Sequence, residues 1–263
     1  MKKINQWANA LLFLMLIMTT ACAHEFQKDT FATKHGKQVV LTAIKHASIE
    51  INYDGKEIEV DPVSGMQPKT DYRKFPKADL ILITHDHTDH LDPKAISELS
   101  KPGTVIIANL ASAKKIMGKS TVMKNGDHLS FGSDIQIDAV PAYNITPGHL
   151  QFHPKGCGNG YILTLDGLRI YISGDTEDIP EMKELKNIDI AFLPVNQPFT
   201  MTPEQAAKVA KMIHPKVLFP YHYSETKIER VAQLLKGSGI DVRIRNYQSL
   251  IPQHYYKLNF LST

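Results

Sequence analysis

Seven residues at positions 84–90 constrain this chain more than any other feature of its sequence. They read Thr-His-Asp-His-Thr-Asp-His and directly follow the apolar run Leu80–Ile83. Loops at strand ends often carry functional groups, because the sheet holds those groups in place. Imidazole and carboxylate together form the ligand set of zinc and similar borderline metals. Histidine makes up only 12 of the 263 residues, so this local density favours a metal site over a solvated polar loop.

The order of these groups predicts two neighbouring metal positions. Alternation along an extended loop places His85 and His87 on the same side, where they can bind one cation. The turn at Thr88 then directs Asp89 and His90 towards a second cation. A site of this kind needs more ligands than one loop supplies, so other segments have to contribute.

The overall composition is that of an ordinary globular protein. Hydrophobic residues make up 43% and charged residues 22% of the chain, with only 2 cysteines, which excludes collagen-like, disordered, coiled-coil and disulfide-framework proteins. The formal net charge of +3 is too balanced to indicate a nucleic-acid partner.

The N-terminus predicts export. Lys2 and Lys3 precede the apolar run Ala10–Met18, which is too short for a membrane-spanning helix of about 20 residues. We favour a lipoprotein signal at positions 1–21, cleaved before Cys22, whose lipidation would anchor the protein to a membrane of the cell envelope or periplasm. The alternative is ordinary secretion by cleavage after Ala23, which would release a soluble protein.

The remaining pattern predicts a tether at 22–38 and a single α/β domain at 39–263 with mixed sheets. The expected strands are a hairpin over Val39–Asp61 with an Asp54-Gly55 turn, then Leu80–Ile83, Thr104–Ala108, Ser130–Val140, Tyr161–Leu165, Leu168–Ser173, Ile188–Val195, Val217–Tyr221 and Val242–Tyr247. Helices are expected after an N-cap at Asp92 and at Ile179–Leu185, Pro203–Ile213 and Lys227–Leu235. Thr202-Pro203-Glu204-Gln205 is expected to form a capping box, with Thr202 as the N-cap.

Four further motifs extend the signal of the histidine-rich loop over most of the domain: His46-Ala47-Ser48, Val60-Asp61-Pro62, Ser173-Gly174-Asp175-Thr176 and Tyr221-His222. In this order they resemble the metallo-β-lactamase superfamily. The branch that looks most similar holds the ascorbate-phosphate lactonase-like and N-acyl-phosphatidylethanolamine phospholipase D-like hydrolases. The resemblance implies a four-layer αββα sandwich of two mixed β-sheets flanked by helices.

The resemblance also implies a set of ligands for two divalent metal ions, with zinc expected before manganese or iron. His85 and His87, with one more histidine, would bind the first ion. The second would be bound by Asp89, His90 and His222, and Asp175 would bridge the two. A shared carboxylate offsets the mutual repulsion of two dications.

The third histidine of the first ion is open. The superfamily usually carries it just after a strand, in Thr-Pro-Gly-His or Pro-Ala-x-His, but this chain has Asn144 at that place. His149 lies in a literal Thr-Pro-Gly-His, but several residues beyond the strand end. We favour His153, because it adjoins the glycine-rich run 156–160 that leads into the strand at Tyr161.

The expected activity is metal-dependent hydrolysis. A metal-bound hydroxide would attack a carbonyl or phosphorus, with Asp89 as the catalytic residue that orients the nucleophile and takes its proton. The resemblance points to an ester, lactone or phosphodiester bond in a small-molecule or lipid substrate. The alternative is a non-catalytic metal-binding protein of the cell envelope, which Asn144 keeps open.

Overall fold

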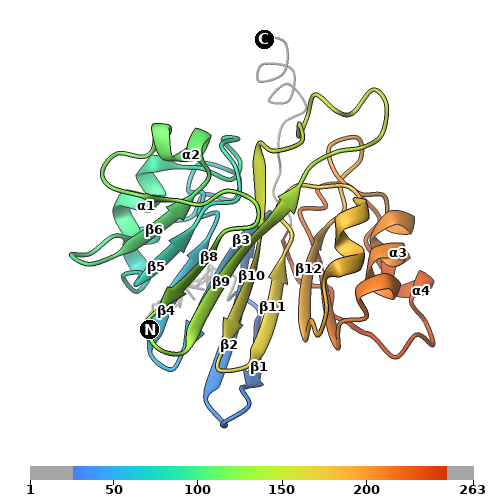
Figure 1. Cartoon of the computed structure of the whole chain (residues 1–263), viewed down its shortest axis with the longest axis horizontal. Coiled ribbons are helices and arrows are strands. Elements are labelled where there is room, and N and C mark those ends of the chain that lie inside the picture. Colours follow the sequence, from blue (N-terminus) through green and yellow to red (C-terminus); the bar gives the residue numbers. More distant parts are fainter. Residues whose placement is uncertain (1–25, 248–263) are drawn as a thin grey trace, which may run out of the picture.

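The computed structural model describes residues 26–247, which form two seven-stranded sheets packed face to face (Figure 1). The predicted signal at 1–21 and the predicted lipidation site Cys22 lie outside the described residues. Among the residues that are described, no helix combines the length and the hydropathy that a membrane span requires.

The N-terminal half of the described chain builds the first sheet. Its strands lie side by side in sequence order: β1 (Lys28–Ala32), β2 (Gln38–Lys45), β3 (Ser48–Tyr53), β4 (Lys56–Val60), β5 (Leu80–Leu82), β6 (Val105–Ala108) and β7 (Thr121–Val122). Neighbours from β1 to β4 are antiparallel, and neighbours from β4 to β7 are parallel. The predicted Asp54-Gly55 turn joins β3 to β4, with positive φ at both residues.

The second sheet repeats this plan with the C-terminal half. Its strands are β8 (His128–Phe131), β9 (Ile135–Ala142), β10 (Gly158–Leu165), β11 (Leu168–Ile172), β12 (Ile190–Pro194), β13 (Val217–Tyr221) and β14 (Asp241–Val242). Neighbours from β8 to β11 are antiparallel and those from β11 to β14 are parallel.

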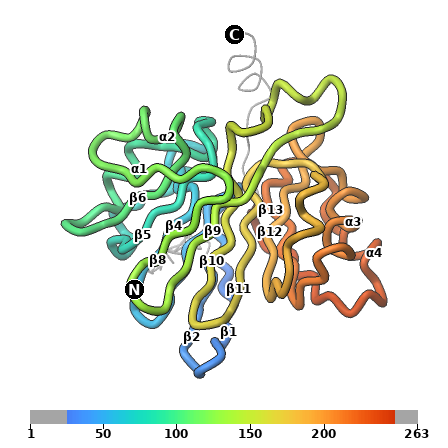
Figure 2. Tube along the Cα trace, in the orientation of Figure 1, coloured from blue at the N-terminus to red at the C-terminus, as the bar shows by residue number. Residues whose placement is uncertain are grey.

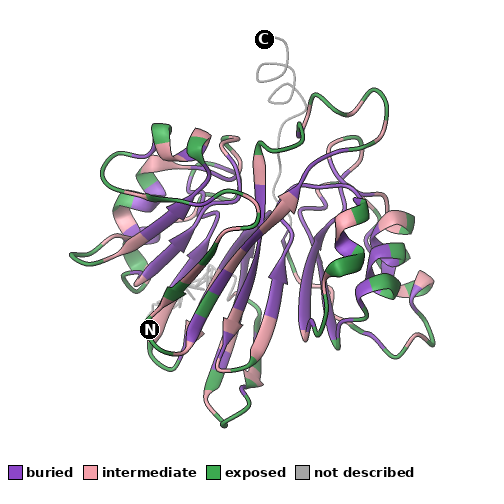
Figure 3. Cartoon of the chain, in the orientation of Figure 1, coloured by how far each residue is buried: buried purple, intermediate pink, exposed green. Residues whose placement is uncertain are grey.

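The helices cover the outer faces of the two sheets. They are α1 (Pro93–Leu99), α2 (Leu110–Lys115), α3 (Pro203–Ile213) and α4 (Glu229–Leu234), and Figure 3 shows the purple, buried strands between their partly green helical surfaces. As predicted, Asp92 caps α1, and Thr202 and Gln205 form a capping box at α3. The four-layer sandwich expected from the sequence is therefore confirmed.

Several elements differ from the sequence-based expectation. The single strand predicted at Ser130–Val140 is a hairpin of β8 and β9, because residues 132–134 turn the chain with a positive φ at Gly132. Part of the expected tether, Lys28–Ala32, pairs with β2 as the edge strand β1.

Two predicted elements in the C-terminal half also differ from the structure, one in length and one in helix type. The expected strand at Val242–Tyr247 contributes only Val242 to β14, since Arg243 and Arg245 turn to form ion pairs with Asp29 instead. The helix predicted at Ile179–Leu185 is a 3₁₀ helix, η2, at Pro180–Glu184.

A fully buried carboxyl group in β4 makes a testable contribution to stability. The Glu59 side chain is 0% exposed, and neither carboxyl oxygen has a hydrogen-bond partner among the described residues. Burial, followed by the charges of Glu50 and Glu57, raises the pKa of Glu59 well above its usual range. The folded state therefore keeps a proton that the unfolded state loses above about pH 4.3, which destabilises the fold as the pH rises.

We expect Glu59→Gln to remove this penalty, because glutamine keeps the shape without an ionisable group. The gain in free energy of unfolding over the unsubstituted protein should grow by about 1.4 kcal/mol per pH unit above about pH 4.3, until the folded-state pKa is reached. Urea denaturation from pH 4 to 8 measures it, with the exposed Glu184→Gln as control. A gain that does not change with pH would contradict the assignment.

Candidate metal centre

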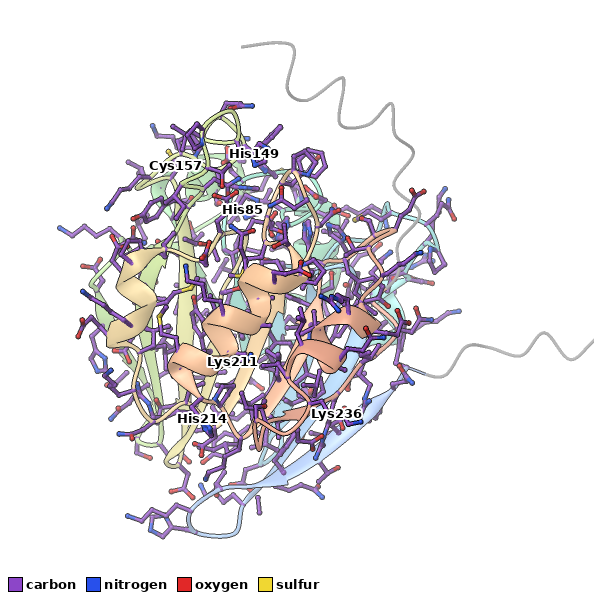
Figure 4. All side chains as sticks on the ribbon, turned by 90° about the vertical axis from the view of Figure 1, so that its right-hand side faces the viewer. His85, His149, Cys157, Lys211, His214 and Lys236 are labelled. Atoms are coloured by element: carbon purple, nitrogen blue, oxygen red, sulfur yellow. The ribbon has the colours of Figure 1, made fainter. Side chains whose placement is uncertain are left out.

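Five segments meet at one end of the two sheets. They are the turn after β2, the loop after β5, the loop between β9 and β10, the segment after β11 and the end of β13. All five follow the carboxyl ends of strands that run in the same direction within their sheets, so they reach a common edge. Figure 4 shows His85 and His149 at this end, together with Cys157, and Lys211, His214 and Lys236 towards the opposite end.

Backbone contacts hold the strand ends of the two sheets together at this edge. Asn159 of β10 donates its N–H to the carbonyl of Thr84 over 2.9 Å, and the Tyr161 hydroxyl donates to the carbonyl of Ile83 over 2.8 Å. His222 donates its N–H to the carbonyl of His46 over 3.0 Å. The segments that carry the predicted ligands are thereby fixed by the sheets themselves.

The approach of these backbones depends on Gly174. It has φ +62, and a Cβ there would lie only 2.9 Å from the carbonyl oxygen of Asn159 and 3.0 Å from the Thr84 Cβ. A larger residue would push the segment that carries Asp175 away from the loop that carries His85.

The Asp175 carboxylate lies at the centre of the cluster, 3% exposed. The shortest distances to its oxygens are 3.1 Å from His222 Nε2, 3.2 Å from His153 Nε2, 3.3 Å from His90 Nε2 and 3.9 Å from His85 Nε2. The structure thus brings one carboxylate into reach of imidazoles from two different loops and one strand end.

The first group of side chains contains His85, His87 and His153. Each offers a ring nitrogen within 4.8 Å of those of the other two. The ring centroids of His85 and His87 are 4.5 Å apart, and His153 lies 5.2 and 5.0 Å from them. His153 donates its Nδ1–H to the Phe199 carbonyl over 3.0 Å, so Nδ1 carries the proton and Nε2 faces Asp175.

The second group contains Asp89, His90, His222 and one residue that the sequence analysis did not assign, His46. The Nε2 of His46 lies 3.1 Å from Asp89 Oδ2, and its ring lies 3.7 Å from that of His222. His46 is fully buried. Its position in the His-Ala-Ser motif was a signal, but the sequence could not show that Asp89 is its partner.

Asp61 orients His90. Its carboxylate accepts hydrogen bonds from the N–H and the hydroxyl of Thr84, and it lies 2.8 Å from His90 Nδ1. A carboxylate at Nδ1 holds a proton there, and Nε2 is the nitrogen that faces Asp175, at 3.3 Å. The Val-Asp-Pro motif pointed to Asp61, but the sequence did not predict that Asp61 orients His90.

The two carboxylates of the cluster are ionised. Burial alone would raise the pKa of Asp175, but the charges of His222 and His90 outweigh burial and lower it well below its usual range. Burial is likewise outweighed at Asp89, whose pKa is lowered well below its usual range by the ion pair with His222 at 3.7 Å and the hydrogen bond with His46 at 3.1 Å. Both groups therefore bring negative charge into a buried space, where charge without a partner is costly.

The histidines divide into two electrostatic classes. Burial, with the neighbouring His90, lowers the pKa of His85 well below its usual range, and burial with His153 lowers the pKa of His87 to about 4. At His90 and His222 the charge of Asp175 outweighs burial, raising the pKa of the former well above its usual range and that of the latter to about 9. The carboxylates thus require positive charge beside them, while His85 and His87 are neutral imidazoles that can donate lone pairs.

The unsatisfied atoms of the cluster fit a metal centre. Buried polar atoms normally have a hydrogen-bond partner, and each exception needs a physical reason. Several of the exceptions among the described residues lie together here: Nε2 of His85, His90 and His153, both ring nitrogens of His222, and Oδ1 of Asp175. Imidazole nitrogens and carboxylate oxygens are atoms from which cations accept electron pairs, so the donor set fits metal binding.

The loop between β9 and β10 decides which downstream histidine reaches the cluster. It is the yellow-green segment that rises beyond the sheets in Figure 2. The structure brings His153 to Asp175. His149 belongs to neither the first nor the second group of side chains, and its Nδ1 lies 3.3 Å from Glu177 Oε1. Asn144 donates its side-chain N–H to the carbonyls of His149 and Phe199. It holds the loop instead of acting as a ligand.

Glu177 is a functional residue that the sequence analysis missed. Its side chain is fully buried, and Oε2 accepts the backbone N–H groups of Ile145 and Thr146 over 2.7 and 2.6 Å. These bonds fix the start of the loop that carries His153. The only signal was its position directly after Gly-Asp-Thr.

Comparison with known proteins agrees with the fold. A family model described as "Beta-lactamase superfamily domain" matches residues 40–222, from β2 to the predicted ligand His222. A UPF0173 metal-dependent hydrolase of Lysinibacillus sphaericus is 32% identical over 210 residues, which cover 75% of this chain and 92% of that protein.

Solved structures give the same result. A crystal structure of a candidate metal-dependent hydrolase from Parabacteroides distasonis is 61% identical, with a TM-score of 0.82 over 85% of this chain and all of that one. Igni18, a metallo hydrolase of Ignicoccus hospitalis, is 24% identical with a TM-score of 0.67, over 79% of this chain and 95% of that one, and is similar in fold. The chain belongs to the metallo-β-lactamase superfamily, together with the UPF0173 metal-dependent hydrolases.

Proposed function

We propose that this superfamily hydrolase binds two divalent cations and cleaves an ester, lactone or phosphodiester bond. His85, His87 and His153 would bind one ion, Asp89, His90 and His222 the other, and Asp175 would be shared. The observation that carries this proposal is the set of buried, unpartnered imidazole and carboxylate atoms that converge on Asp175. Nitrogen and carboxylate donors suit zinc first, and manganese or iron next.

Bound cations would supply Lewis acidity and would lower the pKa of water at the site to near neutrality. The protein's own contribution is to orient the reacting groups. Asp89 is the most suitable proton acceptor, because its side chain is 13% exposed, whereas that of Asp175 is only 3% exposed. His46 holds Asp89 at Oδ2 and leaves Oδ1 to orient the attacking water and take its proton.

His46 has a supporting role in this proposal. It contacts both Asp89 and His222, and burial with the charge of His222 lowers its pKa to about 4, so it is neutral at physiological pH. A neutral imidazole can donate one hydrogen bond to Asp89 and keep that carboxylate in a single orientation.

Metal content should distinguish the two histidines of the loop. We expect about two equivalents of zinc per chain in the reconstituted protein, because two groups of donors are present. His153→Ala should lose about one equivalent, since it removes a ligand, whereas His149→Ala should keep both. Inductively coupled plasma mass spectrometry measures this. Full occupancy in His153→Ala alone would reverse the assignment.

Hydrolysis should depend on Asp89. Metal-loaded protein is assayed with chromogenic esters, a lactone and a phosphodiester, and Asp89→Asn should lower the rate with any accepted compound about 100-fold or more. Metal analysis of the same variant separates loss of a proton acceptor from loss of an ion. An unchanged rate would refute the role of Asp89. Absence of hydrolysis in the fully loaded protein would instead favour a non-catalytic metal-binding protein.

The Glu177 anchor should control the loop. Glu177→Gln replaces the charged acceptor of two backbone N–H groups by a neutral amide oxygen, which weakens both hydrogen bonds, a change expected to cost about 1–3 kcal/mol. Hydrogen exchange in residues 144–153 should accelerate about tenfold or more, as measured by mass spectrometry. Glu225→Gln, at an exposed loop position, serves as the control. Equal exchange in both variants would show that Glu177 does not hold the loop.

A further inference from the structure

One cavity opens directly onto the first group of histidines. It has a volume of about 170 Å³, and His85, His87, His153 and Asp175 are among the residues that line it. Pockets for drug-sized ligands usually measure about 300–1,000 Å³. The space beside the candidate metal centre is therefore small.

The remaining wall of the cavity is largely apolar. Ala142, Phe152 and Pro154 contribute hydrocarbon surface, and the Cys157 side chain adds a thiol. The Phe152 ring packs at 4.9 Å from the ring of Phe199, so this wall is held by the same segment that accepts the hydrogen bond of His153. An apolar wall beside polar reacting groups favours a substrate with a short hydrocarbon portion.

The cavity also lacks a cationic side chain. Among the described residues, no lysine or arginine lines it, and two carboxylates, Asp86 and Asp175, do. Of the lysines nearest in the chain, Lys155 pairs with Glu181 away from the cavity, and Lys115 pairs with Asp86 and balances the charge of that carboxylate. Sites that select phosphate or carboxylate groups commonly bind the anion with arginine or lysine.

We propose that this cavity receives the acyl part of a small, uncharged ester or lactone, and that it discriminates against anionic and long-chain substrates. The inference rests on the proposed hydrolase function and narrows its substrate class. Gln151 and Cys157 stand on the cavity wall and are exposed, so they are accessible to substitution without disturbing the core.

A matched series of 4-nitrophenyl esters tests this inference on the metal-loaded full chain. We expect kcat/KM for the butyrate to exceed that for the octanoate and for the anionic hemisuccinate by about tenfold or more, which corresponds to about 1.4 kcal/mol. Bis(4-nitrophenyl) phosphate should be cleaved more slowly still. A preference for the octanoate, the hemisuccinate or the phosphodiester would overturn the inference while leaving the hydrolase function intact.

Two variants alter the cavity in opposite ways. Cys157→Phe fills it and should raise KM for the butyrate about tenfold at unchanged metal content, with the exposed Met212→Phe on α3 as control for added bulk. Gln151→Arg adds a cation and should raise the hemisuccinate-to-butyrate ratio of kcat/KM about fivefold. No change in either quantity would show that substrate does not use this cavity.

Alkylation of Cys157 gives a readout that does not depend on turnover. Iodoacetamide is applied to metal-free protein, and peptide mass spectrometry follows the label at Cys157. Butyramide, an uncharged acyl compound that is not an ester, should slow labelling about threefold near saturation, and inorganic phosphate should not. If the loaded protein hydrolyses none of the esters, the hydrolase function fails, and the protection by butyramide alone decides whether the cavity takes uncharged acyl groups.

Discussion

The buried charge of Asp175 is the constraint on which the rest of the site depends. An ionised carboxylate at 3% exposure is costly unless positive charge lies beside it, and the imidazoles of His222 and His90 lie 3.1 and 3.3 Å from its oxygens. Asp61 and Glu177 then act on the groups around it, one by orienting His90 and the other by holding the loop of His153. The arrangement is stable only as a set, because removing one member leaves another buried group without a partner.

The sheets supply the rigidity that this set requires. Each sheet changes from antiparallel to parallel pairing, at β4 in the first and at β11 in the second, so that strand ends gather at one edge. Functional side chains on strand ends move little, because the hydrogen-bonded ladders behind them are fixed. The loop between β9 and β10 is the exception. It reaches the edge from a long excursion, and it needs its own buried anchors at Asn144 and Glu177.

Much of the fold and of the side-chain cluster could be predicted from local signals. The histidine-rich loop, the Asp54-Gly55 turn and the Thr202 capping box are encoded within a few residues, and each has the predicted form. The position of His153 was favoured for its proximity to the strand at Tyr161. Roles that depend on contacts between distant segments could not be derived: Glu177 meets Ile145 across 32 residues, and His46 meets Asp89 across 43. Short polar turns inside apolar runs, as at Gly132, were also missed.

The division of the ligands between the two halves of the chain couples assembly to metal uptake. His85, His87, Asp89 and His90 belong to the first sheet's half, and His153, Asp175 and His222 to the second. Neither half of the chain contains all the proposed ligands, and the unfolded chain does not bring them together. Any free energy released when ions bind would therefore be added to the cohesion between the halves. If metal is scarce in the cell, the protein would lose its reaction centre, and the association between the two sheets would also become weaker.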